Sequence, residues 1–238
     1  MAGTLLMLAE AGADVHIWSL SDGRYGSRWG EAEETARVRR TEAIESASLA
    51  GATWHPPLFE DLGLVYHPEH VRLVSSVIRQ VRPNVLLVPS AFDYTEDHRE
   101  ASRLLVTAAF TREIGSYPAE PVAPPSDEAV AVYHALPYGL RDQYGRPQRP
   151  GLFVDIAPVF ERKKVMLARH RSQEEWLEQS QGTSPLECME AMSLEAGRLS
   201  GCFERAEGWN RHNPLGLSPE TYTPLEEALG DACAHVDR

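Results

Sequence analysis

The short apolar run from Val85 to Val88 is the feature that most constrains the fold of this chain. It lies between Pro83 and Pro89, and a run of four apolar residues between such breakers predicts a buried strand. Helical patterns flank it, with apolar residues every three to four positions at Val71, Val74, Ile78 and Val81 before it and at Ala101, Leu104, Leu105 and Ala108 after it. A buried strand between two amphipathic helices is typical of a parallel α/β sheet.

The same alternation continues along the rest of the chain. Patterns predict helices at residues 2–11, 31–50, 71–82, 159–181 and 185–200, and strands at 15–20, 129–136 and 153–156. Gly12 and Gly51 stand where the first two helices should end. We therefore predict one Rossmann-like α/β domain over residues 1–213, with a parallel sheet and helices on both faces. Residues 214–238 are expected to form a loosely ordered tail.

Composition narrows the class of partner. The 238 residues carry a net charge of −12, which argues against nucleic acid and anionic membranes, because phosphate-rich partners require basic patches. No apolar stretch approaches the roughly 20 residues of a membrane span, and the first residues do not read as a signal peptide. Three widely spaced cysteines indicate a reducing compartment. We expect a cytoplasmic protein that binds a small molecule.

Chemistry-bearing side chains follow the predicted strand at 85–88. Asp93, Asp97 and His98 fall in a predicted loop before the next helix, which we expect to begin near residue 99. Ligands of parallel α/β sheets bind at the carboxyl ends of strands, so these residues are placed for metal binding or acid–base chemistry. A catalytic zinc site usually has three protein ligands, and this loop supplies one histidine. The alternative is that Asp97 caps the helix and His98 is a surface residue.

Several stretches occur in a characteristic order over residues 2–180. They are residues 2–16, Ser21-Asp22-Gly23, Arg39-x-x-Glu42-Ala43, Arg82-Pro83-Asn84-Val85, Asp97-His98 and His170-Arg171-Ser172-Gln173. Each is weak alone, but the ordered set resembles the PIG-L/LmbE family of zinc-dependent N-deacetylases. The resemblance implies a hydrolase that uses zinc to remove an acyl group from an N-acylated amino sugar or a similar small amide.

The His-Pro-Asp-Asp motif of that family does not occur in this sequence. In the family the motif ends the first strand, supplies two zinc ligands and the general base, and directly precedes the helix that begins here near Met1. The resemblance therefore implies that a central strand, between the strands at 15–20 and 85–88, is missing from this chain. Two explanations stay open: the natural start lies upstream of Met1, or the chain is a fragment without metal-dependent activity. As given, we expect weak or no zinc binding, poor solubility and no catalysis.

The resemblance also assigns roles at the predicted catalytic loop. It makes His98 the third zinc ligand, and Asp97 a carboxylate that orients a ligand or the base. Family members often carry an oxyanion-stabilising histidine where this chain has Thr95. Thr95, or His134 on the strand at 129–136, is the candidate to replace it. For His134 the alternative is an imidazole satisfied within the sheet.

Three further residues are predicted to bind substrate. Asp22 follows the strand at 15–20, and a plain turn role is its alternative. Arg39 offers forked donors to an anionic or polyol group, or pairs with Glu42 on the helix surface. His170 shares a helical face with Leu167 and either lines the pocket or packs in the core.

The sequence also offers an alternative metal motif and an alternative function. The string His67-Pro68-Glu69-His70 resembles a metal motif, but no buried strand precedes it. The rival function is that of a metal-free LmbE-like protein that acts by binding or association only. The sequence does not specify which sugar is bound or the oligomeric state.

Overall fold

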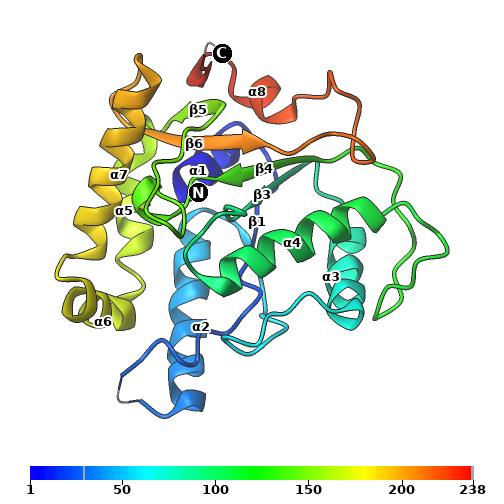
Figure 1. The fold of residues 1–238 in the computed structure, drawn as a ribbon, viewed down its shortest axis with the longest axis horizontal. Coiled ribbons are helices and arrows are strands. Elements are labelled where there is room, and N and C mark those ends of the chain that lie inside the picture. The colour runs from blue at the N-terminus through cyan, green and yellow to red at the C-terminus, as the bar shows by residue number, and fades with distance from the viewer. Residues whose placement is uncertain (29, 237–238) are drawn as a thin grey trace. The chain divides into compact units, whose positions relative to one another are not determined.

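The computed structural model describes residues 1–28 and 30–236 (Figure 1). The chain divides into two compact units. Unit 1 comprises Met1–Gly63, Phe153–Glu207 and Asp231–Arg238, and unit 2 comprises Leu64–Leu152 and Gly208–Gly230. Both units are therefore assembled from segments far apart in the sequence. Within the described residues, no helix is long and apolar enough to cross a membrane.

Unit 2 is built on the strand that the sequence predicted. β3 (Val85–Val88) pairs in parallel with β4 (Ala131–Ala135), and β4 pairs in antiparallel fashion with β6 (Ala206–Arg211) at residues 209–211. The remaining elements of unit 2 are α3 (Pro68–Val81), α4 (Glu96–Thr111), the 3-10 turn η1 (Tyr138–Leu140) and α8 (Pro224–Leu229). The sheet was predicted to be parallel, and the antiparallel pairing of β6 with β4 makes it mixed.

Helices α3 and α4 pack side by side and carry the core of unit 2 (Figure 1). Val71 and Val74 of α3 and Leu104 of α4 are almost fully buried, as their helical spacing predicts. The buried guanidinium of Arg79 donates to the carbonyl oxygens of Thr111 and Arg112 at 3.1 Å each. Carbonyls left open at the end of α4 thus gain donors from the neighbouring helix.

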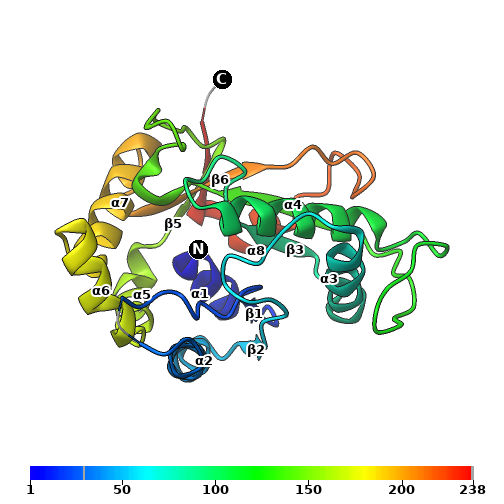
Figure 2. The same cartoon turned by 60° about the horizontal axis from the view of Figure 1, so that its bottom comes forward.

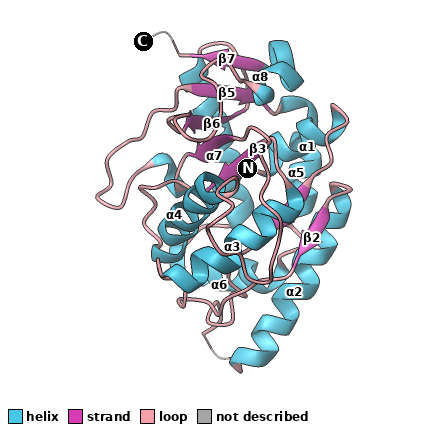
Figure 3. Ribbon diagram, turned by 90° about the vertical axis from the view of Figure 1, so that its right-hand side faces the viewer, coloured by secondary structure: helices cyan, strands magenta, loops and turns pink. Residues whose placement is uncertain are grey.

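Unit 1 contains a second parallel strand pair. β1 (His16–Trp18) pairs with β2 (Thr53–His55), and α2 (Ala32–Leu49) connects them. Figure 2, which views α2 almost along its axis, shows β2 beside this helix. The other elements of unit 1 are α1 (Ala2–Glu10), the 3-10 turns η2 (Ala157–Val159) and η3 (Gly230–Ala232), α5 (Phe160–Leu167), α6 (Arg171–Gln181), α7 (Pro185–Ser200), β5 (Leu152–Asp155) and β7 (Cys233–His235). β5 and β7 are neighbouring strands (Figure 3).

A buried carboxylate fixes the start of α1 in unit 1. Glu207 accepts hydrogen bonds from the backbone N–H groups of Gly3 and Thr4 at 2.9 and 2.8 Å, and Lys163 Nζ lies 2.9 Å from it. A side chain at Gly3 would place its Cβ 2.6 Å from Ile156, so only glycine allows this close approach. The negative charge sits where the helix N-terminus is positive, and Lys163 balances it.

Several predicted element boundaries were wrong, each because of a tertiary contact or a weak local signal. Asp97 and His98 lie in the first turn of α4, not in a loop before it, since α4 begins at Glu96. The helix predicted at 159–181 is two helices, α5 and α6, and His170 is the residue directly before the second of them. Strand β6 was not predicted, and residues 214–238, expected to be loosely ordered, contain α8 and β7.

Candidate active site

The carboxyl end of β3 in unit 2 presents a paired carboxylate and imidazole. Asp93, in the loop after the strand, is buried, and its Oδ1 lies 3.1 Å from Nδ1 of His98. The backbone N–H of Thr95 donates to the same oxygen at 2.9 Å. His98 is half exposed, and its Nδ1 contact with Asp93 leaves Nε2 available to a metal or substrate. Orienting one ring nitrogen by a carboxylate is the usual support of a metal-binding histidine.

The charge of Asp93 is stabilised by its donors. Burial by itself would raise the pKa of Asp93, but the hydrogen bonds from His98 and from the backbone of Thr95 and Tyr138 hold that pKa below its usual value. Asp93 is therefore ionised at neutral pH. An ionised Asp93 favours a proton on Nδ1 of His98 and so leaves the lone pair on Nε2.

The carboxylate next to His98 in the sequence is that of Asp97. Asp97 is buried in the first turn of α4, while the orienting hydrogen bond comes from Asp93. Thr95 is the N-cap residue of α4, and its side chain makes no capping hydrogen bond. The sequence signal that identifies Asp93 is its place in the loop after the strand, five residues before His98. The proposed roles of Asp97 and Thr95 stay predictions.

His134 lies at the carboxyl end of β4, paired in register with Val88 of β3. Its Nδ1 lies 3.1 Å from Ser102 Oγ and 3.3 Å from the carbonyl oxygen of Pro89, and its Nε2 lies 3.0 Å from Nδ1 of His212. Both ring nitrogens are thus engaged within unit 2. Burial lowers the pKa of His134 and of His212, so both rings are neutral at pH 7.

Aromatic side chains surround the Asp93 loop. Phe92 and Tyr94 are more than half exposed, and the rings of Tyr94 and Tyr138 lie 6.1 Å apart. The N–H of Gln143 donates to the Phe92 carbonyl at 3.1 Å and ties the loops after β3 and β4 together. Exposed aromatic rings beside polar groups suit an amphipathic ligand such as a sugar ring. These rings were not among the site residues predicted from the sequence.

The donor set for zinc is incomplete. Within residues 1–28 and 30–236, no three His, Cys, Asp or Glu side chains are arranged to hold a metal ion. His98, with Asp93 behind it, has the character of one ligand, whereas a catalytic zinc site uses three. The residues present therefore do not fit a complete zinc site.

Unit 1 contains a cavity of about 340 Å³ between the loop after β1 and helix α2. Its lining includes Asp22, Arg24, Arg39, Trp54 and His170. All three predicted substrate-binding residues are thus found in one cavity. Its size lies in the range of small-molecule sites.

Asp22 organises the wall of this cavity. Its Oδ1 accepts from the backbone N–H groups of Arg24 and Asp61 at 3.1 Å each, and its Oδ2 lies 2.9 Å from the Arg24 guanidinium. Both carboxylate oxygens are engaged, which matches the turn role left open by the sequence. Arg24 also pairs with Glu33 and Glu60.

Arg39 is a partly buried cation in the lining of this cavity. Its Nη1 donates to the Gly23 carbonyl at a long 3.4 Å, and a Cβ at Gly26 would come within 2.2 Å of it. Burial lowers the pKa of Arg39, and the nearby carboxylates of Asp61 and Glu42 oppose that effect. The carboxylate of Glu42, considered as the alternative partner of Arg39, accepts hydrogen bonds from Ser172.

Glu42 instead caps helix α6. Its carboxylate oxygens accept from the N–H and the hydroxyl of Ser172 at 2.8 and 2.7 Å. Gln173 donates to the Gly26 carbonyl at 2.9 Å, and His170 lines the cavity at the helix start. The Arg39-x-x-Glu42 and His170-to-Gln173 stretches, 130 residues apart, are thus joined in unit 1. The helical face shared by His170 and Leu167 was a wrong prediction, because α5 ends at Leu167.

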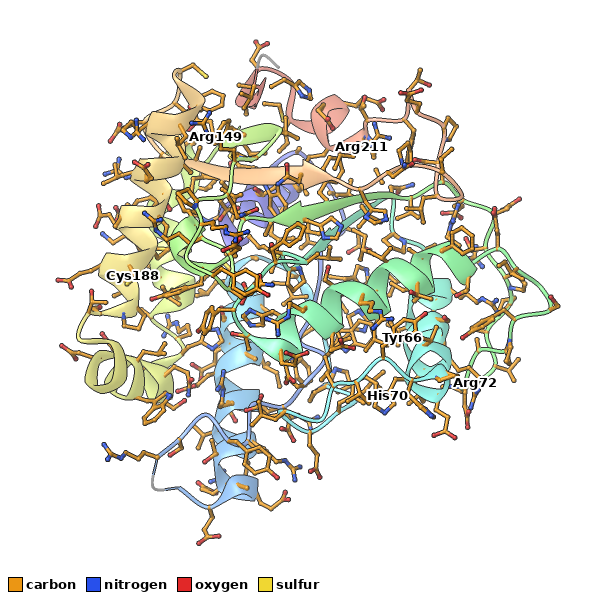
Figure 4. All side chains as sticks on the ribbon, in the orientation of Figure 1. Tyr66, His70, Arg72, Arg149, Cys188 and Arg211 are labelled. Atoms are coloured by element: carbon orange, nitrogen blue, oxygen red, sulfur yellow. The ribbon has the colours of Figure 1, made fainter. Side chains whose placement is uncertain are left out.

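The metal-like string at 67–70 has ordinary structural contacts. His67 caps α3 and accepts from the N–H of Glu69 at 3.4 Å, while Nδ1 of His70 lies 3.0 Å from the Val65 carbonyl. Figure 4 shows His70 near Tyr66 and Arg72. The string therefore forms the start of a helix, as its lack of a preceding strand indicated.

Solved structures with a similar fold show the class of protein to which this fold belongs. The chain has the mixed α/β fold of LmbE-like deacetylases: it superposes on N,N′-diacetylchitobiose deacetylase of Pyrococcus horikoshii with a TM-score of 0.71 and 23% identity, over 93% of this chain and 82% of that one. The 4-carboxy-2-hydroxymuconate hydratase GalB of Pseudomonas putida gives 0.68 and 26%, over 90% of each chain. A teicoplanin deacetylase gives 0.62 and 16%, over 89% and 92%.

Residues 1–109 match the family described as PIG-L: GlcNAc-PI de-N-acetylase. Diacetylchitobiose deacetylase of Thermococcus kodakarensis is 30% identical over 183 residues, which are 73% of this chain and 64% of that protein. The chain thus spans less than two thirds of this curated relative. The predicted relationship is confirmed: the chain carries a PIG-L domain match, and its homologues are diacetylchitobiose deacetylase and other LmbE-like deacetylases.

Proposed function

We propose that this chain is an N-deacetylase-type hydrolase domain whose substrate is an N-acetylated amino sugar or a related small amide. The observation that carries the proposal is the Asp93–His98 pair at the carboxyl end of β3. In a chain related to diacetylchitobiose deacetylase, this pair supplies an oriented imidazole at the place where such a sheet binds ligands. Three free cysteines agree with a cytoplasmic location.

The chain's own residues divide between positioning and binding. Asp93 holds His98, and the neutral His134 provides a hydrogen-bonding ring at the end of the neighbouring strand. In unit 1, Arg39 and His170 line a cavity that fits a monosaccharide. Zinc is the metal we propose for this reaction, and His98 Nε2 would contribute one of its ligands.

We further propose that the chain as given binds zinc weakly and does not hydrolyse amides. The incomplete donor set supports this, because one imidazole holds a divalent ion far less tightly than three ligands. The same observation favours a second candidate, a metal-free protein that binds N-acetylated sugars without cleaving them.

One experiment tests both candidates. Zinc content and release of primary amine from N,N′-diacetylchitobiose are measured for the chain and for a version preceded by a strand segment that ends in Ala-His-Pro-Asp-Asp. We expect one zinc per chain and amine release only in the extended version, both lost in its His98→Ala variant. An extended version that binds zinc but releases no amine contradicts the deacetylase proposal. Tight zinc binding by the unextended chain would show that other ligands exist.

A further inference from the structure

The lining of the cavity in unit 1 has a charge balance opposite to that of the whole chain. Its charged residues are the arginines Arg24, Arg37, Arg39 and Arg40 and the carboxylates Asp22 and Glu33. The whole chain, by contrast, has 23 lysines and arginines against 35 acidic residues. A concave site lined mainly by one sign of charge attracts ligands of the other sign. The charge of this lining therefore favours an anion.

The acidic groups of the lining are already paired with Arg24. The guanidinium of Arg24 lies 2.9 Å from Asp22 Oδ2 and 3.2 Å from Glu33 Oε1. Within residues 1–28 and 30–236, neither Arg39 nor Arg40 forms an ion pair at 4.0 Å or less. The carboxylates that act on Arg39, those of Asp61, Glu42 and Asp22, do so from a greater distance. Two guanidinium groups of the lining thus have no counter-charge in contact.

The guanidinium of Arg39 is placed by backbone contacts and keeps donors open. Its one hydrogen bond to a described residue is the long bond of 3.4 Å from Nη1 to the Gly23 carbonyl. A Cβ at Gly23 would lie 2.7 Å from Cζ of Arg39, so glycine there lets the guanidinium pack against the loop. The buried Arg79 instead makes five hydrogen bonds to backbone carbonyls. Because a guanidinium carries five N–H donors, Arg39 presents unused donors to the cavity.

Arg40 and His170 add two further groups to the same cavity. Arg40 is exposed, and its Cζ lies 5.3 Å from the ring centroid of Trp54, which holds the guanidinium over an apolar surface. Burial lowers the pKa of His170, so this ring is neutral at pH 7 and offers a hydrogen bond without a charge. Charged and neutral donors therefore meet in one cavity.

We propose that this cavity binds an acidic sugar whose phosphate or carboxylate group is held by Arg39 and Arg40. The forked N–H groups of arginine match the oxygens of either anion. The volume of about 340 Å³ leaves room for a sugar ring beside the anionic group. The sugar part rests on the proposed function, whereas binding of the anion does not require amide hydrolysis.

Titration with inorganic phosphate tests the anion part of the proposal. In NMR spectra of the isotope-labelled chain, phosphate should shift the side-chain N–H signals of Arg39, Arg40 and Trp54, and sodium chloride at equal ionic strength should not. N-acetylglucosamine 1-phosphate, its 6-phosphate isomer and N-acetylmuramic acid then distinguish a phosphate from a carboxylate ligand. At least one of these acidic sugars should bind about tenfold more tightly than N-acetylglucosamine, because it gains charge-assisted hydrogen bonds.

Variants decide whether Arg39 is responsible, each checked for folding by circular dichroism. Arg39→Gln should weaken the acidic sugar about thirtyfold and neutral N-acetylglucosamine only about fivefold, because the neutral ligand loses no charge-assisted bond. Arg39→Lys keeps the charge without the fork and should recover part of the loss. The matched control is Arg37→Gln, on the same helix and in the same lining, because Arg37 is already paired with Glu34 and its loss should leave binding unchanged.

Two results would overturn the proposal. One is equal binding of phosphate by Arg39→Gln and the unchanged chain, and the other is that none of the acidic sugars binds more tightly than N-acetylglucosamine. The proposed hydrolase function is judged separately, by amine release from the extended version. Phosphate binding that depends on Arg39, without amine release, would contradict only the hydrolase function.

Discussion

His98 Nδ1 lies 3.1 Å from Asp93 Oδ1, so the imidazole on the first turn of α4 is held by a carboxylate from the loop after β3. The two residues are five positions apart, and the turn between them brings the side chains together. This contact leaves the outer nitrogen of His98 free of Asp93. It is the relationship on which the proposed hydrolase site depends.

Replacing Asp93 by Asn should destabilise the protein by about 1–2 kcal/mol at neutral pH, because a charge-assisted hydrogen bond is lost in a buried place. The pKa of Asp93 is depressed in the folded state, so its stabilising contribution is present above the unfolded value of about 3.9 and is lost as the pH falls further. In urea unfolding, the free energy of unfolding of Asp93→Asn should thus fall less than that of the unchanged protein when the pH is lowered below about 4. Asp127→Asn, at an exposed position, is the control. Identical acid sensitivity of Asp93→Asn and the unchanged protein would contradict this prediction.

Glu207→Gln should be the more damaging change, at about 3 kcal/mol, because it leaves the buried Lys163 without its counter-charge. Burial raises the pKa of Glu207, but the attraction of Lys163 and of the N-terminal ammonium group, together with the hydrogen bonds from Lys163 and the backbone of Thr4, outweighs burial and holds that pKa well below the usual range. The contribution of Glu207 is therefore present above about pH 4.3 and is lost as the pH falls below it. Thermal and urea unfolding measure the effect, with the exposed pair variant Glu161→Gln as control. A change under about 0.5 kcal/mol would show that the buried pair is not stabilising.

Tyr133→Phe should loosen α8. The buried Tyr133 hydroxyl donates to Glu226 Oε2 at 2.6 Å, and burial together with Glu226 raises the pKa of Tyr133 far above its normal value. Losing this bond should cost about 1–2 kcal/mol and speed proteolytic cleavage near α8. Tyr144→Phe, at an exposed tyrosine, should leave the cleavage rate unchanged. Equal cleavage rates in both variants would show that Tyr133 does not hold α8.

Gly26→Ala should weaken sugar binding in unit 1 with little loss of stability. The added Cβ would meet Arg39 Nη1 at 2.2 Å and displace the guanidinium in the cavity. We expect about fivefold weaker binding of N-acetylglucosamine, equal to about 1 kcal/mol for one lost hydrogen bond. Titration by NMR measures it, with Gly115→Ala, where an added Cβ meets only an ordinary contact, as control. Unchanged binding in Gly26→Ala would remove Arg39 from the proposed substrate site.

Local patterns predicted much of the architecture. The apolar run at Val85–Val88 is β3 without change, and the amphipathic spacing from Val71 onward is the buried face of α3. Both predictions succeed because the spacing of apolar residues along the sequence reflects which face of a helix or strand is buried. The strand β6 was not predicted because it lacks such a pattern. Its sequence contains the polar residues Glu207 and Asn210, with Gly208 between them. The ammonium group of Lys163 and the backbone N–H at the start of α1 stabilise the buried carboxylate of Glu207 in this strand.

The sequence by itself determined the α/β class and the relationship to the LmbE-like deacetylases, and it predicted a site around His98. Tertiary structure alone decided that Asp93 orients His98, that Glu42 caps α6 and so breaks the predicted long helix at His170, and that Arg39 and His170 line one cavity. The physical reason is the range of the forces involved. Hydrophobic periodicity acts within one helix or strand, whereas a hydrogen bond or charge pair depends on atoms that only folding brings within about 3 Å of each other.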